Sequence, residues 1–376
     1  MTRRENLRRV LRGETPAWTP CSINLGQWFD HHVATDTMPR ELAGVGDHLD
    51  AMRLLGCDIF SRNFNGGFIE SFEGAQPQRT TEPGQLGPRT IVRFRTPHGK
   101  LQHIAETQTQ LTASYDVEDL VKDWESDRKA YLWLLERRRC RWDKQAFTKM
   151  TNQIGDDGIA MIQIARTPLK QLHTDFGLDH ACLFVMDEPE DAKMICDLHW
   201  RAMWPAIQQI ADAPDVDAAC LMDNVDAPFY TPTLCERYWS PYVRQATDLF
   251  AARGKRLFVH ACGHLHQLKQ TFIDSHVHGL EGMAHPPLGD WTIQDARDMP
   301  APFIYNGGFA AHEQVTKSDD EVRAFYRRFF EELDGFPRFI FASACQTAIT
   351  TTWDRIQLVV DLCREFGGRP ATEPVG

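Results

Sequence analysis

Short apolar runs recur along the chain, and each ends at a polar or small residue before a segment of helical length. The eight runs lie at residues 20–23, 57–60, 160–164, 218–222, 256–259, 278–280, 303–305 and 339–341. Such runs predict buried strands, and amphipathic segments such as 322–333 between most of them predict helices. Strands that alternate with helices form a parallel sheet, so eight units predict an α/β fold, the closed TIM (β/α)8 barrel. An open doubly wound sheet is the weaker alternative, because no glycine-rich phosphate loop follows an early strand.

Two segments depart from this rhythm. Residues 2–5, Thr-Arg-Arg-Glu, form a capping-box pattern and predict an N-terminal helix that closes the barrel floor or packs on its side. Two alternating segments flank the Pro/Gly turn at 96–100 and predict a β-hairpin over about 88–108, inserted after the second strand. Since no linker or repeat divides the chain, we expect residues 1–376 to form a single TIM-barrel domain.

The composition of the chain limits the kinds of molecule that it is expected to bind. The net charge of −11 argues against nucleic acid and against an anionic membrane surface. No stretch approaches a membrane span, and no apolar segment of a signal peptide follows the first residues, so we expect a cytoplasmic protein. In a reducing cytosol the ten cysteines are free thiols, core residues or metal ligands. The residues leave the oligomeric state open, with a homodimer among the options.

Three side chains that can bind a metal ion lie where two of the predicted strands end. His260 and Cys262 follow the run at 256–259, and Cys345 follows the run at 339–341. Side chains at i and i+2 of an extended backbone point the same way, and a barrel keeps its active site at the carboxyl ends of its strands. One histidine and two thiolates can hold zinc with an open fourth position, the arrangement of a catalytic zinc. The sequence therefore predicts a zinc site here.

Two carboxylates also end predicted strands. Asp223 and Glu281 could each be a general acid or base, a further metal ligand, or the group that orients a metal-bound histidine. The plainer alternative is that each caps the helix that follows. Histidines near His260, such as His264 and His266, are rival ligands, although a surface or capping role fits them better.

Further polar and aromatic residues lie close to strand ends. Candidates for substrate binding are Asn24, Trp28, Phe29 and Asn63, and candidates for cofactor binding are Asn306 and Gly307. Trp28 and Phe29 could cover an aromatic binding pocket, or they could pack against other side chains of the protein. The Asn306-Gly307 segment offers a polar side chain and flexible backbone near a ligand, and a plain turn fits it equally well.

Nearly the whole chain resembles the uroporphyrinogen decarboxylase superfamily, and within it the zinc-dependent, corrinoid-linked methyltransferases. The segments that carry this resemblance are residues 3–16, 55–58, 221–224, 260–263 with Cys345, and 306–308. The most specific match is His260-Ala261-Cys262-Gly263 with the distant Cys345, because an identical set holds zinc in the methyltransferase branch. The decarboxylase branch is similar in fold but has an arginine-rich loop after the first strand. Here that loop is 24–29, without arginine.

The resemblance implies methyl transfer between a small O- or S-methylated compound and the cobalt of a corrinoid. We expect the cobamide to be carried by a separate corrinoid protein. The aromatic loop at Trp28-Phe29 favours a methoxylated aromatic substrate. Three alternatives stay open: a methylcobamide-to-thiol methyltransferase, a metal-free decarboxylase of the uroporphyrinogen type, and a non-catalytic protein that binds a corrinoid or a metal.

Overall fold

Parallel strands form the centre of the computed structural model, which describes residues 1–61, 68–111, 113–310 and 315–368. Seven strands make one parallel sheet in the order β1-β15-β14-β13-β12-β11-β10, and β2 pairs with β9 beside it. Their bounds are β1 Cys21–Ser22, β2 Ile59–Ser61, β9 Gly158–Ala160, β10 Ile162–Ile164, β11 Ala218–Val225, β12 Arg256–Ala261, β13 Gly279–Met283, β14 Ile304–Phe309 and β15 Phe339–Ser343. Each of the eight predicted runs contributes to these strands, and the run at 160–164 includes the end of β9 and all of β10.

The strands curl into a barrel because the sheet returns to its own beginning. β9 and β10 are separated only by Met161, so one run pairs with β2 on one side and with β11 on the other. At the opposite edge β1 pairs with β15. Within the described residues no ladder joins β1 to β2, which leaves one opening in the hydrogen-bonded circle. The predicted α/β fold of TIM-barrel type is confirmed.

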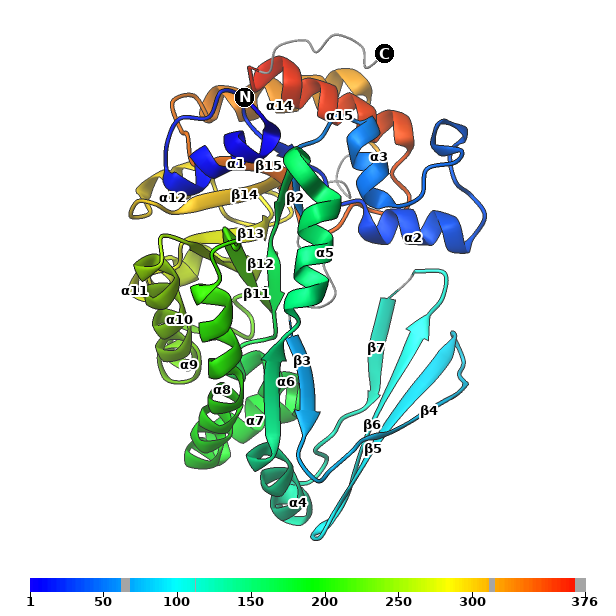
Figure 1. The fold of residues 1–376 in the computed structure, drawn as a ribbon, viewed down its shortest axis with the longest axis vertical. Helices are drawn as coiled ribbons and strands as arrows, with labels where there is room; N and C mark the ends of the chain where they lie inside the picture. The colour runs from blue at the N-terminus through cyan, green and yellow to red at the C-terminus, as the bar shows by residue number, and fades with distance from the viewer. Residues whose placement is uncertain (62–67, 112, 311–314, 369–376) are drawn as a thin grey trace.

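Helices surround the barrel (Figure 1). They are α2 Gly26–Ala34, α3 His48–Leu54, α4 Trp124–Glu136, α5 Lys144–Ile154, α6 Pro168–Phe176, α7 Leu178–Asp187, α8 Pro189–Asp212, α9 Pro232–Tyr238, α10 Ser240–Ala252, α11 Lys269–Asp274, α12 Ile293–Asp298, α14 Asp319–Glu332 and α15 Trp353–Phe366. One of them, α4, lies away from the barrel strands beside the insertion. The predicted helix at 322–333 corresponds to α14, which begins with a full capping box at Ser318 and Glu321. Among the described helices, none combines the length and the apolar character that a membrane crossing needs.

The N-terminal helix α1, Arg3–Arg12, plugs the end of the barrel where the strands begin. Thr2 caps it by accepting a hydrogen bond from the backbone of Glu5, and Gly13 ends it in the left-handed conformation. Its apolar face, Leu7, Val10 and Leu11, packs on side chains from inside the barrel, including those of Phe60, Phe258 and Ile340. This end is the floor of the barrel, and the opposite end, at the carboxyl ends of the strands, is the mouth.

The segment between β2 and β9 forms a larger insertion than the predicted hairpin. The hairpin itself is present as β5, Pro88–Thr96, and β6, Gly99–Gln108, and it lies within an antiparallel sheet of order β4-β5-β6-β7. The flanking strands are β4 Gln78–Pro83 and β7 Ala113–Glu118, while β3 Phe68–Phe72 pairs with β8 Arg138–Trp142. In Figure 1 this inserted sheet, drawn in cyan, projects beside the barrel. That barrel and insertion form a single domain stays a prediction.

Candidate metal centre

The barrel brings His260, Cys262 and Cys345 together at its mouth. His260 is the penultimate residue of β12 and is almost fully buried, whereas Cys262 directly follows β12 and is half-buried. Cys345 comes two residues after β15, also half-buried. The strands β13 and β14 lie between β12 and β15 in the sheet, so the curl of the barrel makes residues 85 positions apart into neighbours.

The spacing of the three ligand atoms fits a zinc ion. One nitrogen of His260 and the sulfurs of Cys262 and Cys345 all lie within 4.8 Å of one another, and Cys345 Sγ is 3.7 Å from His260 Nε2. With tetrahedral zinc about 2.0 Å from nitrogen and about 2.3 Å from sulfur, those two ligand atoms would stand about 3.5 Å apart. The donor set is therefore already close to the geometry of a bound ion. That these residues bind zinc stays a prediction.

Glu281 orients the histidine of this cluster. His260 and Glu281 are register partners in the parallel ladder of β12 and β13, and Glu281 Oε2 lies 2.5 Å from His260 Nδ1. A carboxylate at Nδ1 favours the tautomer that leaves the Nε2 lone pair free, and Nε2 is the nitrogen that faces Cys345. Of the roles considered for Glu281, its contacts match the orienting one, while a role in proton transfer stays a prediction.

Gly282 makes room for the imidazole of His260. A Cβ at this position would lie 2.6 Å from His260 Cε1, and the φ angle of +82° is one that side-chain-bearing residues rarely adopt. The register between β13 and β14 also shifts here, between Glu281 and Met283. Sequence reasoning missed Gly282, although an isolated glycine inside a strand is a signal of a bulge or a close approach.

Asn24, just after β1, holds the turn that contains Cys345 through two hydrogen bonds. Cys345 has a φ of +70°, an uncommon conformation for a residue with a side chain. Asn24 Nδ2 donates to the Cys345 carbonyl at 3.0 Å, and the Asn24 backbone amide donates to Ser343 Oγ at 2.9 Å. Asn24 was predicted to bind substrate, which stays a prediction. Its observed contacts position a predicted zinc ligand.

Asp223 is fully buried at the bulge that ends β11. It accepts three hydrogen bonds of 2.7 Å, from the backbone amide and the hydroxyl of Thr167 and from Trp239 Nε1. Burial raises the pKa of this carboxyl, and the bonds from Thr167 and Trp239 oppose that rise. These contacts tie the end of β11 to the loop before α6 and to α10. The carboxylate that accepts from His260 Nδ1 is that of Glu281, and a catalytic role for Asp223 stays a prediction.

The other predicted site residues have different surroundings. Trp28 and Phe29 on α2 are buried, and Trp28 Nε1 donates to the carbonyl of Thr351 at 2.8 Å. Their contacts are those of packing residues, and their predicted part in substrate binding stays a prediction. Asn63 lies outside the described residues.

Asn306 and Gly307, the predicted cofactor contacts, lie on β14. Asn306 Oδ1 is buried and has no hydrogen-bond partner among the described residues, and a Cβ on Gly307 would collide with the carbonyl of Met283. Asn306 and Glu281 line a cavity of about 20 Å³, the room of about one water molecule. Asn306 and Gly307 therefore pack closely between β13 and β14, next to Glu281. Cofactor binding there stays a prediction.

A pattern that sequence reasoning overlooked lies at the floor. Residues 274–279, Asp-Ser-His-Val-His-Gly, match the Asp-x-His-x-x-Gly form of corrinoid-binding proteins. Here the segment joins α11 to the first residue of β13, at the end of the barrel opposite the predicted zinc ligands. His276 Nδ1 bonds to Asp248 at 2.7 Å, and His278 Nδ1 accepts from the Leu257 backbone amide at 3.0 Å. Both histidines thus have structural partners in the turn that precedes β13.

A parallel barrel with a cluster of metal-ligating side chains at its mouth defines the class of this protein. The chain belongs to the uroporphyrinogen decarboxylase (URO-D) family, whose sequence profile matches residues 159–366. These residues include β10 to β15 and all three predicted zinc ligands. The predicted family membership is confirmed.

Comparison with solved structures supports the fold. A methyltransferase from Methanosarcina mazei aligns over 97% of this chain and 99% of its own, with a TM-score of 0.60 and 12% identity. A Listeria monocytogenes protein assigned as a vitamin-B12-independent methionine synthase aligns over 59% of this chain and 68% of its own, with 18% identity and a TM-score of 0.38. The second likeness is too distant to define the fold. No curated protein sequence matches the chain significantly.

Proposed function

We propose that this chain is a zinc-dependent methyltransferase that moves a methyl group between a small O- or S-methylated substrate and the cobalt of a corrinoid protein. The observation that carries the proposal is the convergence of one ring nitrogen of His260 with the thiols of Cys262 and Cys345 within 4.8 Å, with His260 Nε2 3.7 Å from Cys345 Sγ. Membership of the URO-D family and a fold shared with a solved methyltransferase are in keeping with it.

The residues of the chain have distinct tasks in this proposal. His260, Cys262 and Cys345 would hold zinc, which when bound supplies a Lewis acid with an open fourth position. Glu281 fixes the tautomer of His260 through the 2.5 Å contact at Nδ1. Asn24 holds the Cys345 turn in place through its hydrogen bond to the Cys345 carbonyl.

The other reactants come from outside the chain. The cobamide would arrive on a partner, because the Asp-x-His-x-x-Gly segment of this chain lies at the floor and its histidines have structural partners. Among substrates we favour a methoxylated aromatic compound. Transfer in the reverse sense, from methylcobamide to an acceptor thiol, would use the same zinc ligands.

The test combines elemental analysis with a screen of methyl donors in the presence of reduced corrinoid. The proposal expects one zinc per chain and methylation of the corrinoid by at least one donor. Protein prepared without chelator that contains no zinc and releases carbon dioxide from a carboxylated porphyrinogen would instead identify a decarboxylase. Zinc without turnover of any donor, in either direction, would identify a binding protein.

A further inference from the structure

A cavity of about 300 Å³ lies between the inserted sheet and the helices of the barrel. Strands β3 to β6 and β8 form one side, and helices α4, α6 and α8 form the other. None of its lining residues is a predicted zinc ligand or a neighbour of one in the chain. Small-molecule sites have volumes from about 300 Å³ upward, so this cavity is large enough for a compact organic ligand.

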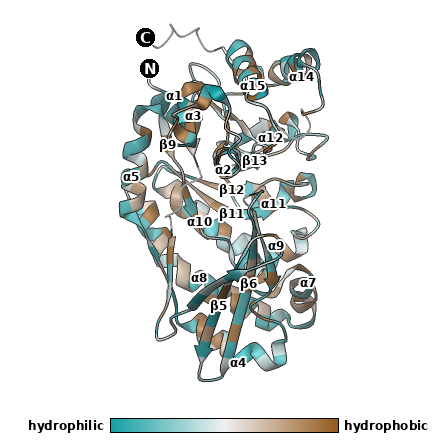
Figure 2. Ribbon diagram, turned by 90° about the vertical axis from the view of Figure 1, so that its right-hand side faces the viewer, coloured by the Kyte–Doolittle hydropathy of each residue, from teal (hydrophilic) through white to brown (hydrophobic). Residues whose placement is uncertain are grey.

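One wall of the cavity is apolar and aromatic. Phe72 of β3 and Phe94 of β5 contact each other edge to face, with ring centroids 5.0 Å apart. Val92 continues this wall along β5, and Leu134 of α4 faces it. Figure 2 shows hydrophobic and hydrophilic residues side by side on β5 and β6. A ring-sized apolar body would bury its surface against this wall.

A network of polar groups joins the two sides of the cavity, and all of its members except Glu70 and Gln171 are buried. Arg138 is 4% exposed, and its guanidinium contacts the carboxylate of Glu70 and Nδ1 of His199. The carboxylate of Asp175 accepts two hydrogen bonds, one from the Tyr131 hydroxyl at 2.6 Å and one from the side-chain amide of Gln171 at 2.8 Å. Because each buried group has partners, the network holds its shape without a ligand, as preorganised binding sites do.

Two further arginines line the cavity and have spare hydrogen-bonding capacity. Arg79 comes from β4 of the insertion and Arg166 from the loop between β10 and α6, so they approach from opposite sides. Both arginines are exposed, and among the described residues neither guanidinium has a hydrogen bond or an ion pair within the protein. With Arg138 they place three guanidinium groups against two carboxylates, Glu70 and Asp175. The lining therefore carries an excess of positive charge and ten N–H donors on two unpaired guanidinium groups.

We propose that this cavity binds an organic anion, a carboxylate on a ring-sized apolar body, with Arg79 and Arg166 pairing with the carboxylate. Arginine recognises carboxylates because its planar fork can donate two parallel hydrogen bonds. An inorganic anion would leave the apolar wall uncovered, and a neutral ring would gain no charge-assisted hydrogen bond from the two arginines. The inference rests on this lining alone and does not depend on zinc or on methyl transfer.

Benzoate is the probe, and the purified full-length protein is titrated with it by calorimetry. We expect saturable binding, at least about tenfold weaker binding of the neutral isostere benzamide, and weaker binding still of acetate, which lacks the ring. Arg79→Gln and Arg166→Gln should each weaken benzoate binding about tenfold. Arg141→Gln is the matched control, since Arg141 points away from the cavity on the exposed face of β8. Absence of saturable binding overturns the proposal, as does unchanged affinity in both arginine variants.

A second arm excludes the metal centre, because carboxylates are also zinc ligands. Cys262→Ala should leave benzoate affinity unchanged if the ligand occupies the cavity. Benzoate binding that is lost in Cys262→Ala and kept in Arg166→Gln would place the ligand on zinc and overturn the proposal. This outcome would leave the proposed methyl transfer untouched, so the two proposals fail separately.

The same chemistry could belong to the substrate or to a separate effector, and kinetics distinguish these sources. Benzoate that competes with the methyl donor would show that the cavity receives the anionic part of the substrate. Benzoate that changes kcat without raising KM would show an effector. In both cases Arg166→Gln should remove the effect of benzoate, and an effect that persists in Arg79→Gln and Arg166→Gln contradicts the proposed pairing.

Discussion

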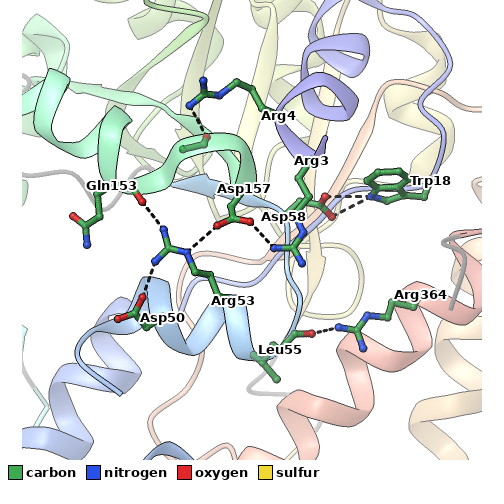
Figure 3. A network of polar contacts seen from close by, with 11 residues as sticks. Arg3, Arg4, Trp18, Asp50, Arg53, Leu55, Asp58, Gln153, Asp157 and Arg364 are labelled. Carbon is green, nitrogen blue, oxygen red and sulfur yellow. Dashed lines mark hydrogen bonds and ion pairs between the residues drawn. The ribbon is translucent and has the colours of Figure 1, made fainter. Parts of the chain in front are cut away.

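The two ends of the barrel are built in different ways. At the floor, charged side chains pair with one another around α1 and the strand beginnings (Figure 3). Arg53 bonds to Asp157 at 2.9 Å and to Asp50 at 2.6 Å, and Arg3 bonds to Asp157 at 3.0 Å. The carboxylate of Asp58 receives the indole N–H of Trp18. These charged groups of the floor thus satisfy one another locally.

At the mouth, the backbone adopts conformations that cost free energy. Asn224 has a φ of +49° and Cys345 one of +70°, and Gly282 sits where any Cβ would meet the imidazole of His260. Asn306 Oδ1 is buried without a partner among the described residues. Floor changes should therefore alter stability alone, whereas mouth changes should alter the metal site as well. Substitutions at the two ends should therefore separate stability from metal binding.

Removing one thiol should give the largest effect. We expect Cys262→Ala to lose zinc and to lower turnover more than about 100-fold, because two remaining ligands hold zinc poorly. Elemental analysis and the methyl-transfer assay measure both. Cys182→Ala is the matched control, since Cys182 is also half-buried but lies on α7. Full zinc retention in a Cys262→Ala, Cys345→Ala double variant would rule the site out.

Chelation gives the corresponding metal-removal experiment on the wild-type protein. We expect turnover to stop while a cooperative thermal transition persists, because the barrel has a large core of its own, unlike small zinc modules that fold only with metal. Collapse of that transition after chelation would show that the metal is structural, and the division between floor and mouth would fail.

A side chain that crowds the imidazole of His260 should have the next largest effect on zinc affinity. In Gly282→Ala the new Cβ meets His260, so we expect zinc affinity to fall about 10–100-fold, as it does when an outer-shell partner is lost. Gly335→Ala is the control: its φ is +69° and nothing lies within 4 Å of the added Cβ. Both variants should lose about 1–2 kcal/mol of stability from the left-handed backbone. Equal zinc affinities in competitive chelator titrations would contradict the predicted role of Gly282.

The contrast between regions also explains which features the sequence could predict. The barrel strands are short apolar runs, so their positions follow from hydrophobicity alone. β4 has every residue exposed and β7 nearly so, hence neither carries an apolar signal, and only the hairpin between them was predictable. The predicted zinc ligands stood out by residue type. That Glu281 rather than Asp223 contacts His260 depends on the register of β12 and β13, which a single sequence does not encode visibly.

A buried carboxylate at the mouth should give a smaller effect. Asp223→Asn turns an amide NH2 toward groups that donate to Asp223, so we expect a loss of about 1–3 kcal/mol of stability. Because the native pKa of Asp223 is raised, its contribution to stability falls as pH rises above the unfolded value, and the variant should lack that pH dependence.

Activity separates the roles of Asp223. Participation in proton transfer would lower turnover by about 10²–10⁴-fold in Asp223→Asn with zinc retained. Turnover near that of the wild type would confine Asp223 to holding Thr167 and Trp239. Asp215→Asn makes the same chemical change on an exposed residue ahead of β11, at the floor, and should alter neither quantity.

The smallest effect should come from the floor itself. Arg53→Met keeps an apolar stem but removes the ion pairs to Asp50 and Asp157. With 28% of the Arg53 side chain exposed, water screens these pairs, and we expect a loss of about 0.5–1 kcal/mol in denaturant unfolding. Arg40→Met is the control, at an exposed arginine in the turn before α3. Zinc affinity in Arg53→Met should equal that of the wild type. A fall comparable to that of Gly282→Ala would mean that the floor network also holds the mouth in shape, and the two ends would then form one cooperative unit.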